Sequence, residues 1–548
     1  MVLAKYPAAF LLLTLAACGS DPTPGSDGSV GWLDGSVDAP DRDAGPPFDG
    51  GRDFDAGPPP ADAGTPDVPP RPDAGPRPVE SVATPPGVVS GSGDHLVLQG
   101  TLLLPDGPLE GDLRIEDGLI TCAAASCPRD NATLIVTNGV ISPGLIDSHN
   151  HLAYDFIPEW EPDPVMLYNN RYEWSDEGSY EAHIAPYADN RSRNTTFCPS
   201  ALWGEARAVV HGTTLMMGQS FDRTCTAGGM RNADHKHRLG YNHMRTSIAS
   251  VRDINDDAAE SLVSSFTDSS EPKTRFAVHM QEGLMGSNLE LEFESFAGRD
   301  TRNNRHMGTS LLAGDGYFGV GLLIHSMGLT TGQLMEAIDT GAHIVWSPSS
   351  NLVLYGDTAP IEEMLDLAID VALAPDWTVS GADNMLEEMR FASGYGIGQS
   401  IDELTPEMIW RMSTSNAAEA VGLADSVGML EVGMHADIVV FGREAMDPYS
   451  AVLDSRAEDI RLTLIEGRAH YGDMNLEAAA AVNGSCEVFD ACGNAKFLCI
   501  ADLPDSDGDW ADDTLEDLRG QLQTIIDEYA DSDPPLSYSA PLPLVECR

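Results

Sequence analysis

The chain has 548 residues and a formal net charge of −55, with 86 acidic side chains against 31 lysines and arginines. Because nucleic acid is itself a polyanion, this balance argues against a nucleic-acid partner. It also opposes adsorption to a bare anionic lipid surface, so any attachment to a membrane needs an acyl anchor.

The first twenty residues have the form of an export signal. Lys5 precedes an apolar run from Ala8 to Ala17, which is too short for an ordinary membrane helix. The run ends in Leu-Ala-Ala followed by Cys18, which resembles the bacterial lipobox. We therefore expect a lipoprotein signal peptide over residues 1–18, with Cys18 lipidated. The alternative is a plain signal peptide cut near Ala17. The expected location is the cell envelope, on the outer membrane or at the cell surface.

A tract of low sequence complexity follows. Residues 19–93 consist mainly of Pro, Gly, Asp and Ala, with few apolar residues to bury. Such a composition predicts a disordered tether, which its like-signed charge keeps extended.

Two histidines stand one residue apart after the apolar run that begins at Ile141. If residues 145–151 form a strand, His149 and His151 point the same way and Asn150 points away. Two imidazoles on one face at the end of a strand suit zinc. The pair alone is also compatible with two polar residues at a strand terminus.

Four later apolar runs also end in polar residues, and helix-like segments such as 331–340 and 360–370 separate some of them. The pattern predicts strand–helix units and a parallel sheet. In a closed (β/α)₈ barrel the C-terminal ends of all strands meet on one face, which carries the chemistry. The runs are residues 275–283, 319–326, 341–351 and 370–377.

Together these motifs resemble the metal-dependent amidohydrolase superfamily, in the branch of the cytosine, guanine and S-adenosylhomocysteine deaminases and the triazine hydrolases. The resemblance covers about residues 94–472. It implies a (β/α)₈ TIM barrel at 141–424 and a small β-sandwich from 94–140 plus 425–473. Residues 474–548 would form an acidic, Cys-containing extension. The motifs that carry it are residues 143–151, Gly212-Thr213-Thr214, His279 with Glu282, His325, Pro348 to Asn351, Asp376 and residues 428–440.

The resemblance also implies a role for each polar residue. One divalent metal, zinc with iron or manganese as alternatives, would generate hydroxide from bound water near neutral pH. Glu282 would shuttle a proton to the leaving nitrogen, and His325 would contact the bound water or the oxyanion. Asp376 would also orient the hydroxide. The implied metal ligands are His149, His151, His279 and Asp376.

A second metal is disfavoured by the distribution of lysine. Some members of the superfamily hold two metals bridged by a carboxylated lysine on the fourth strand. The expected fourth strand, residues 244–251, contains none of the four lysines of the chain, and Lys273 precedes the fifth strand. The residues therefore favour a mononuclear site.

The segment from Ala153 to Ser200 is a long, aromatic-rich insertion that we expect to be a lid. Within it, Arg171 is a candidate to bind a substrate carboxylate, or else forms a surface ion pair, and His183 is a further candidate for substrate contact. Trp377 would narrow the pocket or offer it an aromatic wall, or else packs in the core. Many deaminases of this branch carry a histidine where this chain has Trp346, which weakens any assignment to a specific nucleobase.

The resulting prediction is a hydrolase of non-peptide carbon–nitrogen bonds that deaminates a small heterocycle. The alternatives are hydrolysis of an amide or of another ring substituent by the same site, and a binding lipoprotein without turnover. A homo-oligomer is compatible with the sequence.

Eight cysteines remain besides Cys18, and an even set in an exported chain predicts disulfides. Cys122–Cys127 and Cys198–Cys225 are the proposed pairs, and the pairing of the four C-terminal cysteines stays open.

A helix is expected over residues 513–529. Residues 505–509, with Glu516 at the twelfth position, hint at a calcium loop, but Trp510 replaces its glycine and an acidic helix cap is favoured. Two histidines stand at the starts of strands, away from the C-terminal ends that carry the chemistry, and are expected to be structural: His211 and His343. Three others are expected in a solvated loop: His235, His237 and His243.

Overall fold

The computed structural model describes most of the chain after Thr84, and all of the described residues belong to one compact unit, Pro60–Arg548. The signal segment, Cys18, residues 19–84 of the expected tether and the calcium-loop residues 505–509 lie outside the described residues. The expected end of the tether at residue 93 is wrong, because Gly87–Ser90 form a strand that pairs with residues 134–136. No described helix is both long and apolar enough to cross a membrane. The described residues are 85–91, 93–160, 166–184, 194–218, 229–235, 238–239, 242–247, 256–267, 273–286, 289–300, 306–307, 310–314, 318–442, 445, 447–480, 486–499, 514–530 and 538–547.

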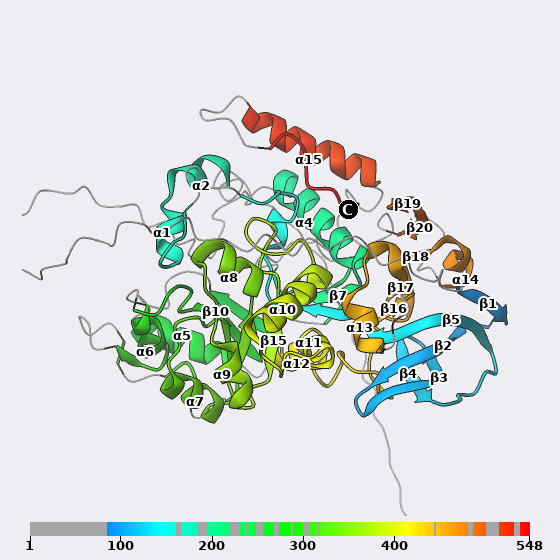
Figure 1. Ribbon diagram of the computed structural model, residues 1–548, viewed down its shortest axis with the longest axis horizontal. Helices are drawn as coiled ribbons and strands as arrows, with labels where there is room; N and C mark the ends of the chain where they lie inside the picture. Colours follow the sequence, from blue (N-terminus) through cyan, green and yellow to red (C-terminus); the bar gives the residue numbers. More distant parts are fainter. Residues whose placement is uncertain are drawn as a thin grey trace, which may run out of the picture. The chain divides into compact units, whose positions relative to one another are not determined.

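One ten-stranded sheet joins segments from the two flanks of the chain. The pairing of β5 with β16, in which Pro143 faces Ile438, brings the flanks together, and Figure 1 shows the blue and orange strands side by side. The expected union of 94–140 with 425–473 is therefore present, while the closed sandwich stays a prediction. The N-terminal strands are β1 (Gly87–Ser90), β2 (His95–Leu104), β3 (Gly107–Glu116), β4 (Leu119–Ala124) and β5 (Ala132–Pro143). The C-terminal strands are β16 (Ile438–Phe441), β17 (Ile460–Ile465), β18 (Arg468–Asp473), β19 (Glu487–Ala491) and β20 (Asn494–Leu498).

The middle of the chain forms parallel strands. The order β15-β14-β13-β10-β9 makes one sheet and β6-β7-β8 another, and every ladder in both is parallel. A parallel bridge between Asn150 and Asp376 places the residues after β6 beside those after β15. This is the expected α/β architecture, and full closure into a barrel stays a prediction. The strands are β6 (Leu145–Asp147), β7 (Thr213–Met216), β8 (Arg231–Asn232), β9 (Met244–Ser247), β10 (Arg275–Met280), β13 (Gly321–His325), β14 (His343–Trp346) and β15 (Val371–Leu373). A short hairpin pairs β11 (Arg299–Asp300) with β12 (His306–Met307).

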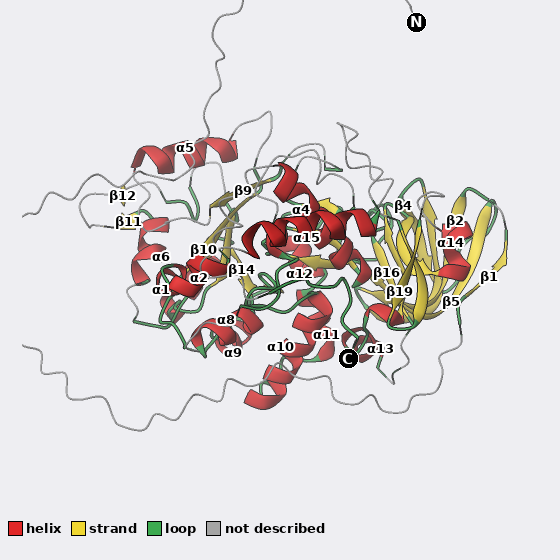
Figure 2. Ribbon diagram, turned by 90° about the horizontal axis from the view of Figure 1, so that it is seen from above, coloured by secondary structure: helices red, strands yellow, loops and turns green. Residues whose placement is uncertain are grey.

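Helices alternate with these strands, and Figure 2 shows them as red ribbons around the yellow sheets. The predicted helix at 331–340 is α7 (Thr331–Asp339), which begins with a capping box between Thr330 and Gln333. The segment 360–370 yields only α9 (Ile361–Asp366), and the C-terminal helix is α15 (Leu515–Ala530). The others are α1 (Arg171–Ser175), α2 (Gly178–His183), α4 (Asn194–Val210), α5 (Asp256–Thr267), α6 (Glu290–Phe296), α8 (Pro348–Tyr355), α10 (Met385–Gln399), α11 (Pro406–Met412), α12 (Ser415–Ala420), α13 (Pro448–Leu453) and α14 (Glu477–Ala480).

The strand expected over residues 145–151 is shorter than predicted, because β6 ends at Asp147. The Asp147 carboxylate accepts hydrogen bonds from the backbone N–H of His149 (3.2 Å) and from the side-chain amide of Asn150 (2.8 Å). The predicted length of the strand was therefore wrong. The predicted directions hold, because the side chains of His149 and His151 both reach the Asp376 carboxylate while that of Asn150 turns back to Asp147.

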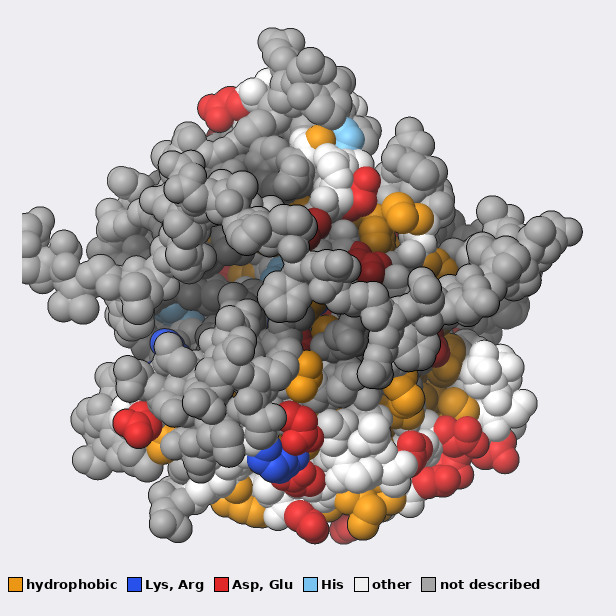
Figure 3. All heavy atoms as spheres, turned by 90° about the vertical axis from the view of Figure 1, so that its left-hand side faces the viewer, with side chains coloured by type: hydrophobic (Ala, Val, Ile, Leu, Met, Phe, Trp, Pro, Cys, Tyr) orange, Lys and Arg blue, Asp and Glu red, His pale blue; other side chains and the backbone are white. Residues whose placement is uncertain are grey.

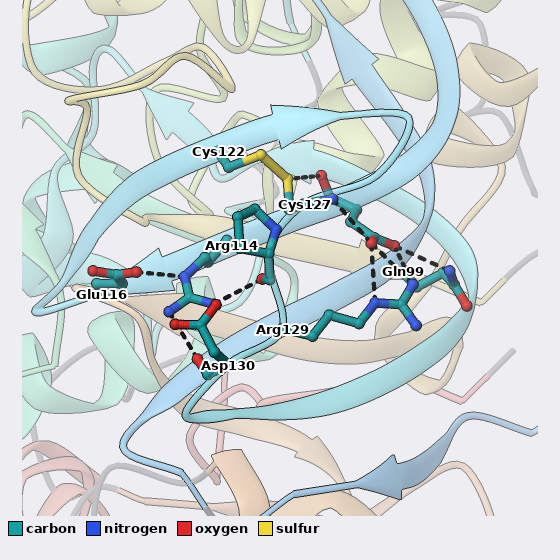
Figure 4. The surroundings of a disulfide bond; sticks show 9 residues. Gln99, Arg114, Glu116, Cys122, Cys127, Arg129 and Asp130 are labelled. Carbon is teal, nitrogen blue, oxygen red and sulfur yellow. Dashed lines mark hydrogen bonds and ion pairs between the residues drawn. A yellow bond between two sulfur atoms is a disulfide. The ribbon is translucent and has the colours of Figure 1, made fainter.

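Disulfides follow the expectation where the described residues allow a comparison. Cys122–Cys127 is confirmed, with its sulfurs 2.01 Å apart, and Figure 4 shows it above Arg129 and Gln99, whose side chains both donate to the Asp112 carboxylate. Cys198 is disulfide-bonded, and Cys225 lies outside the described residues. The four C-terminal cysteines, whose pairing the sequence left open, form two disulfides, Cys486–Cys499 and Cys492–Cys547.

The described surface matches the net charge in sign. Figure 3 shows acidic side chains gathered along the lower part of the face that carries α6, α7 and α9, interspersed with hydrophobic ones.

A buried ion pair links β8 to the ten-stranded sheet. Arg231 is fully buried and donates to Asp437 at 2.5 Å, just before β16, while the N–H of Glu466 donates to the same carboxylate. We predict that Asp437→Asn lowers the free energy of unfolding by about 2 kcal/mol, because Arg231 loses its buried charge partner and keeps only the more exposed Glu466, 3.1 Å away. Denaturant titration measures this. The control Glu294→Gln, which weakens the exposed pair with Arg299, should cost less than about 1 kcal/mol, and an equal effect of both variants would contradict the prediction.

Candidate metal centre

Four side chains converge where the parallel strands end. His279 lies in β10, His325 is the last residue of β13, and His149 and Asp376 follow β6 and β15. One ligand atom from each lies within 4.8 Å of all the others, and all four residues are buried. Residues separated by more than 200 positions therefore form one donor cluster.

His151 lies at the edge of this cluster. Its Nε2 atom is 3.4 Å from Asp376 Oδ1, and His149 Nε2 is 3.0 Å from the same oxygen. Its ring centroid is 5.0 Å from that of His149 and 5.7 Å from that of His279. All four predicted ligands are thus together, but the tightest set of four contains His325, which the sequence had assigned to the bound water, rather than His151.

The donor set fits a divalent metal. Metal–nitrogen and metal–oxygen bonds of about 2.1 Å place the ligand atoms of a tetrahedral site about 3.4 Å apart, and the four ligand atoms here lie within 4.8 Å of one another. His325 Nε2, His149 Nδ1 and His279 Nδ1 are buried and have no hydrogen-bond partner among the described residues. Such unpaired polar atoms are costly in an interior, and a cation would give His325 Nε2 a partner.

Electrostatics keep these groups in their ligand forms. Burial lowers the pKa of His149 and of His325 to about 4 and holds that of His279 well below its usual range, so these imidazoles are neutral at pH 7. Burial alone would raise the pKa of Asp376, but hydrogen bonds from His149 and His151 hold it well below the usual range. Neutral imidazoles beside an anionic carboxylate are what a metal requires.

The backbone at these strand ends is unusual. Gln281, His325 and Asp376 all have positive φ angles, of 47°, 65° and 75°. Residues other than glycine rarely adopt this region, and such strain concentrates at functional sites.

The start of α8 explains the predicted Pro348-to-Asn351 motif. Ser350 Oγ donates to Asp376 Oδ2 at 2.6 Å, leaving Oδ1 toward the histidines. Asn351 Oδ1 lies 2.9 Å from His325 Nδ1, so this nitrogen donates and Nε2 presents its lone pair to the cluster. The motif therefore holds two members of the cluster in orientation.

Glu282 follows β10 and is buried next to the cluster. Its Oε2 atom lies 3.6 Å from His325 Nε2, and its Oε1 accepts a hydrogen bond from the Tyr355 hydroxyl at 2.6 Å. Burial raises the pKa of Glu282 to about 8. Neither Ser350 nor Tyr355 was singled out from the sequence. Ser350 stands inside a recognised motif, whereas Tyr355 carried no signal beyond its place at the end of that helix.

The aromatic residues lie on the other side of His151. The Trp377 ring is 5.2 Å from that of His151, 5.5 Å from Tyr154 and 5.8 Å from Trp174 of the insertion. Trp377 is buried in the main hydrophobic core and its indole N–H donates to Ser380 Oγ, which fits the core-packing alternative. Its role as a wall of the substrate pocket stays a prediction.

The environment of Arg171 differs from the surface ion pair expected as one alternative. It is buried, not on the surface, and its guanidinium pairs with Glu292 at 3.2 Å and with the Tyr172 hydroxyl at 3.0 Å. A buried ion pair of this kind anchors α1, and the role in binding a substrate carboxylate stays a prediction.

The remaining histidines and Lys273 stand apart from the cluster. His211 Nδ1 contacts the carbonyl of Arg207, and burial lowers the pKa of His343 to about 3 at the start of β14. His183 ends α2, and its carbonyl accepts from Tyr538. Lys273 donates to the carbonyl of Asn242, at the end of β10 opposite the donor cluster. His235 is buried rather than solvated, and His237 lies outside the described residues.

Comparison with known proteins agrees with this site. Residues 262–470 match the model of the amidohydrolase family. A 5'-deoxyadenosine deaminase of Methanosarcina mazei is 25% identical over 424 residues, which cover 70% of this chain and 94% of that protein. A 5-methylthioadenosine/S-adenosylhomocysteine deaminase of Halobacterium salinarum is 24% identical over 420 residues, covering 69% and 93%.

Solved structures show the same fold. An atrazine chlorohydrolase of Arthrobacter aurescens, complexed with zinc and atraton, is 18% identical with a TM-score of 0.53, covering 68% of this chain and 95% of that one. A guanine deaminase of Bradyrhizobium japonicum is 14% identical with a TM-score of 0.53, covering 69% and 99%.

The fold and the site together define a TIM-barrel-like α/β hydrolase that acts on carbon–nitrogen bonds. The region that matches the amidohydrolase family model, residues 262–470, holds His279, Glu282, His325 and Asp376.

We predict that the purified protein binds one divalent metal per chain and that His279→Ala abolishes this, because a central donor is lost. Asn351→Ala should weaken the affinity about 10- to 100-fold by releasing His325. Elemental analysis after dialysis, with titration of apoprotein by zinc, measures both. His343→Gln is the matched control and should keep full metal content. Full metal content in the His279→Ala variant would contradict the assignment.

Proposed function

We propose that this protein is a mononuclear metal-dependent hydrolase that deaminates a small heterocycle. The observation that carries the proposal is the convergence of His149, His279, His325 and Asp376, with His151 and Glu282 beside them, at the ends of parallel strands. Such a set of neutral imidazoles and carboxylates, at the face where α/β sheets bind ligands, supports catalysis better than a structural site.

One group of residues would bind the metal, and Glu282 would transfer the proton. When bound, a divalent metal supplies a Lewis acid that makes water nucleophilic near neutral pH. His149, His279 and Asp376, together with His151 or His325, would hold it, with zinc as the first choice and iron or manganese as alternatives. Glu282 carries the proton at Oε2, the oxygen nearer to the cluster, and its raised pKa near 8 suits a group that both accepts and donates at neutral pH.

The relatives guide the choice of substrate. Two of them are named as deaminases of adenosine derivatives, so 5'-deoxyadenosine, 5-methylthioadenosine and S-adenosylhomocysteine are the first compounds to test. Hydrolysis of an amide or of another ring substituent by the same residues is the second candidate, and a binding protein without turnover the third. Conversion of the adenine ring to a hypoxanthine ring with release of ammonia would identify the first, whereas cleavage of an amide or loss of another ring substituent would identify the second.

The proposal includes export and anchoring. The segment 1–18 supports a signal peptide with Cys18 as the lipidated residue, and residues 19–84 would tether the folded body, which begins before β1, to the envelope. In a bacterial host, we predict that Cys18→Ala abolishes incorporation of labelled fatty acid and shifts the protein out of the membrane fraction. Equal labelling of both forms would contradict the anchor without affecting the hydrolase.

Replacement of the proposed proton shuttle should separate chemistry from metal binding. We predict that Glu282→Gln keeps one metal per chain but lowers kcat by at least about 100-fold, because the amide cannot carry the proton. Metal content and ammonia release from the adenosine panel are the measurements. Glu205→Gln is the control, since Glu205 is another buried glutamate with a pKa near 8 but bonds to Asn232 and Gly229 instead. Undiminished turnover in the Glu282 variant would refute this role.

A further inference from the structure

A chain of hydrogen bonds leads from the insertion to Glu282. The indole N–H of Trp174, in α1, lies 2.7 Å from the Tyr355 hydroxyl at the end of α8. That hydroxyl lies 2.6 Å from Glu282 Oε1. Tyr355 and Glu282 are buried, so solvent does not compete for these bonds.

The direction of both bonds follows from the chemistry of the first donor. An indole N–H can only donate, so the Tyr355 oxygen must accept from Trp174. The single proton of the tyrosine hydroxyl is then directed at Glu282 Oε1. Whatever the protonation state of Glu282, Oε1 is an acceptor, and any proton on the carboxyl sits on Oε2, the oxygen 3.6 Å from His325 Nε2.

The insertion is fixed to this part of the site by its backbone as well. Arg171 N donates to the carbonyl of Glu282 at 3.1 Å, and Leu284 N donates to the carbonyl of Asn169 at 2.7 Å. Asn170 forms an antiparallel bridge with Gly283, where a side chain would collide with the Asn169 carbonyl. Trp174 is therefore held on a segment that is tied directly to the strand end carrying Glu282.

We propose that Tyr355 is a positioning residue for Glu282 and that Trp174 sets the direction of its hydrogen bond, so that the working proton of Glu282 is confined to the oxygen facing the metal cluster. This inference rests on the proposed function for its catalytic meaning. The hydrogen-bond chain itself can be observed without turnover, metal or substrate.

Kinetics test the catalytic part. With whichever adenosine derivative is turned over, Tyr355→Phe should lower kcat about 10- to 100-fold, the range for losing a hydrogen bond to a charged group, with KM and metal content unchanged. Trp174→Phe should lower kcat less, because Tyr355 can still donate. The double variant should equal Tyr355→Phe alone, because Trp174 acts only through Tyr355.

Two matched controls come from the same insertion. Tyr168→Phe removes a buried hydroxyl that has no hydrogen-bond partner among the described residues. Trp160→Phe removes an indole that also packs on Tyr180 but donates to Ser179 instead. Both should keep kcat. Full kcat in Tyr355→Phe, additive losses in the double variant, or a loss confined to KM or metal content would overturn the positioning role.

Spectroscopy tests the hydrogen-bond chain independently. In metal-free protein with ¹⁵N-labelled tryptophan, the Trp174 indole proton is the resonance lost in Trp174→Phe. It should move upfield in Tyr355→Phe, where its acceptor is gone, and stay in place in Tyr168→Phe. An unmoved resonance overturns the inference even if the enzyme is active. A shifted resonance without turnover on any substrate supports the chain and counts against the proposed function instead.

Discussion

The site and the scaffold both depend on the buried carboxylate of Asp376. A charge in a protein interior costs several kcal/mol unless it is paired and hydrogen-bonded. Here His149 and His151 approach one oxygen and Ser350 the other, and the backbone of Asp376 exchanges hydrogen bonds with that of His149 and His151. The contacts that stabilise this charge are therefore the same contacts that place the end of β6 beside the end of β15.

Strain at the strand ends is tolerated because the strands themselves are firmly held. Each non-glycine residue at positive φ costs of order 1 kcal/mol or more, and Gln281, His325 and Asp376 all stand there. Behind them, β10, β13 and β15 consist of fully buried residues, as expected for parallel strands covered on both faces. The apolar strands offset the local cost, and the sharp turns bring the donor groups toward one another.

The sequence predicted what depends on local pattern and missed what depends on register. Histidines at the ends of apolar runs could be recognised one strand at a time, so the cluster of His149, His279, His325 and Asp376 was foreseeable. The end of β6 at Asp147 was not, because it depends on pairing with β7 and with the residues after β15, which lie far away in the chain. Tyr355 could not be found either, since its significance arises only where α8, β10 and the insertion meet. The addition of β19 and β20 to the sheet likewise depends on pairing between distant segments.

The two sides of the cluster differ in chemistry, and this difference bears on what it can bind. The rings of Trp377, Tyr154 and Trp174 pack on one another next to His151. Glu282 and Tyr355 place a carboxyl and a phenol hydroxyl beside His325. The cluster therefore has apolar rings as neighbours near His151 and proton-carrying groups near His325. The proposed reaction at a heterocycle needs proton transfer at one edge of the ring, and the groups that can supply it all lie beside His325.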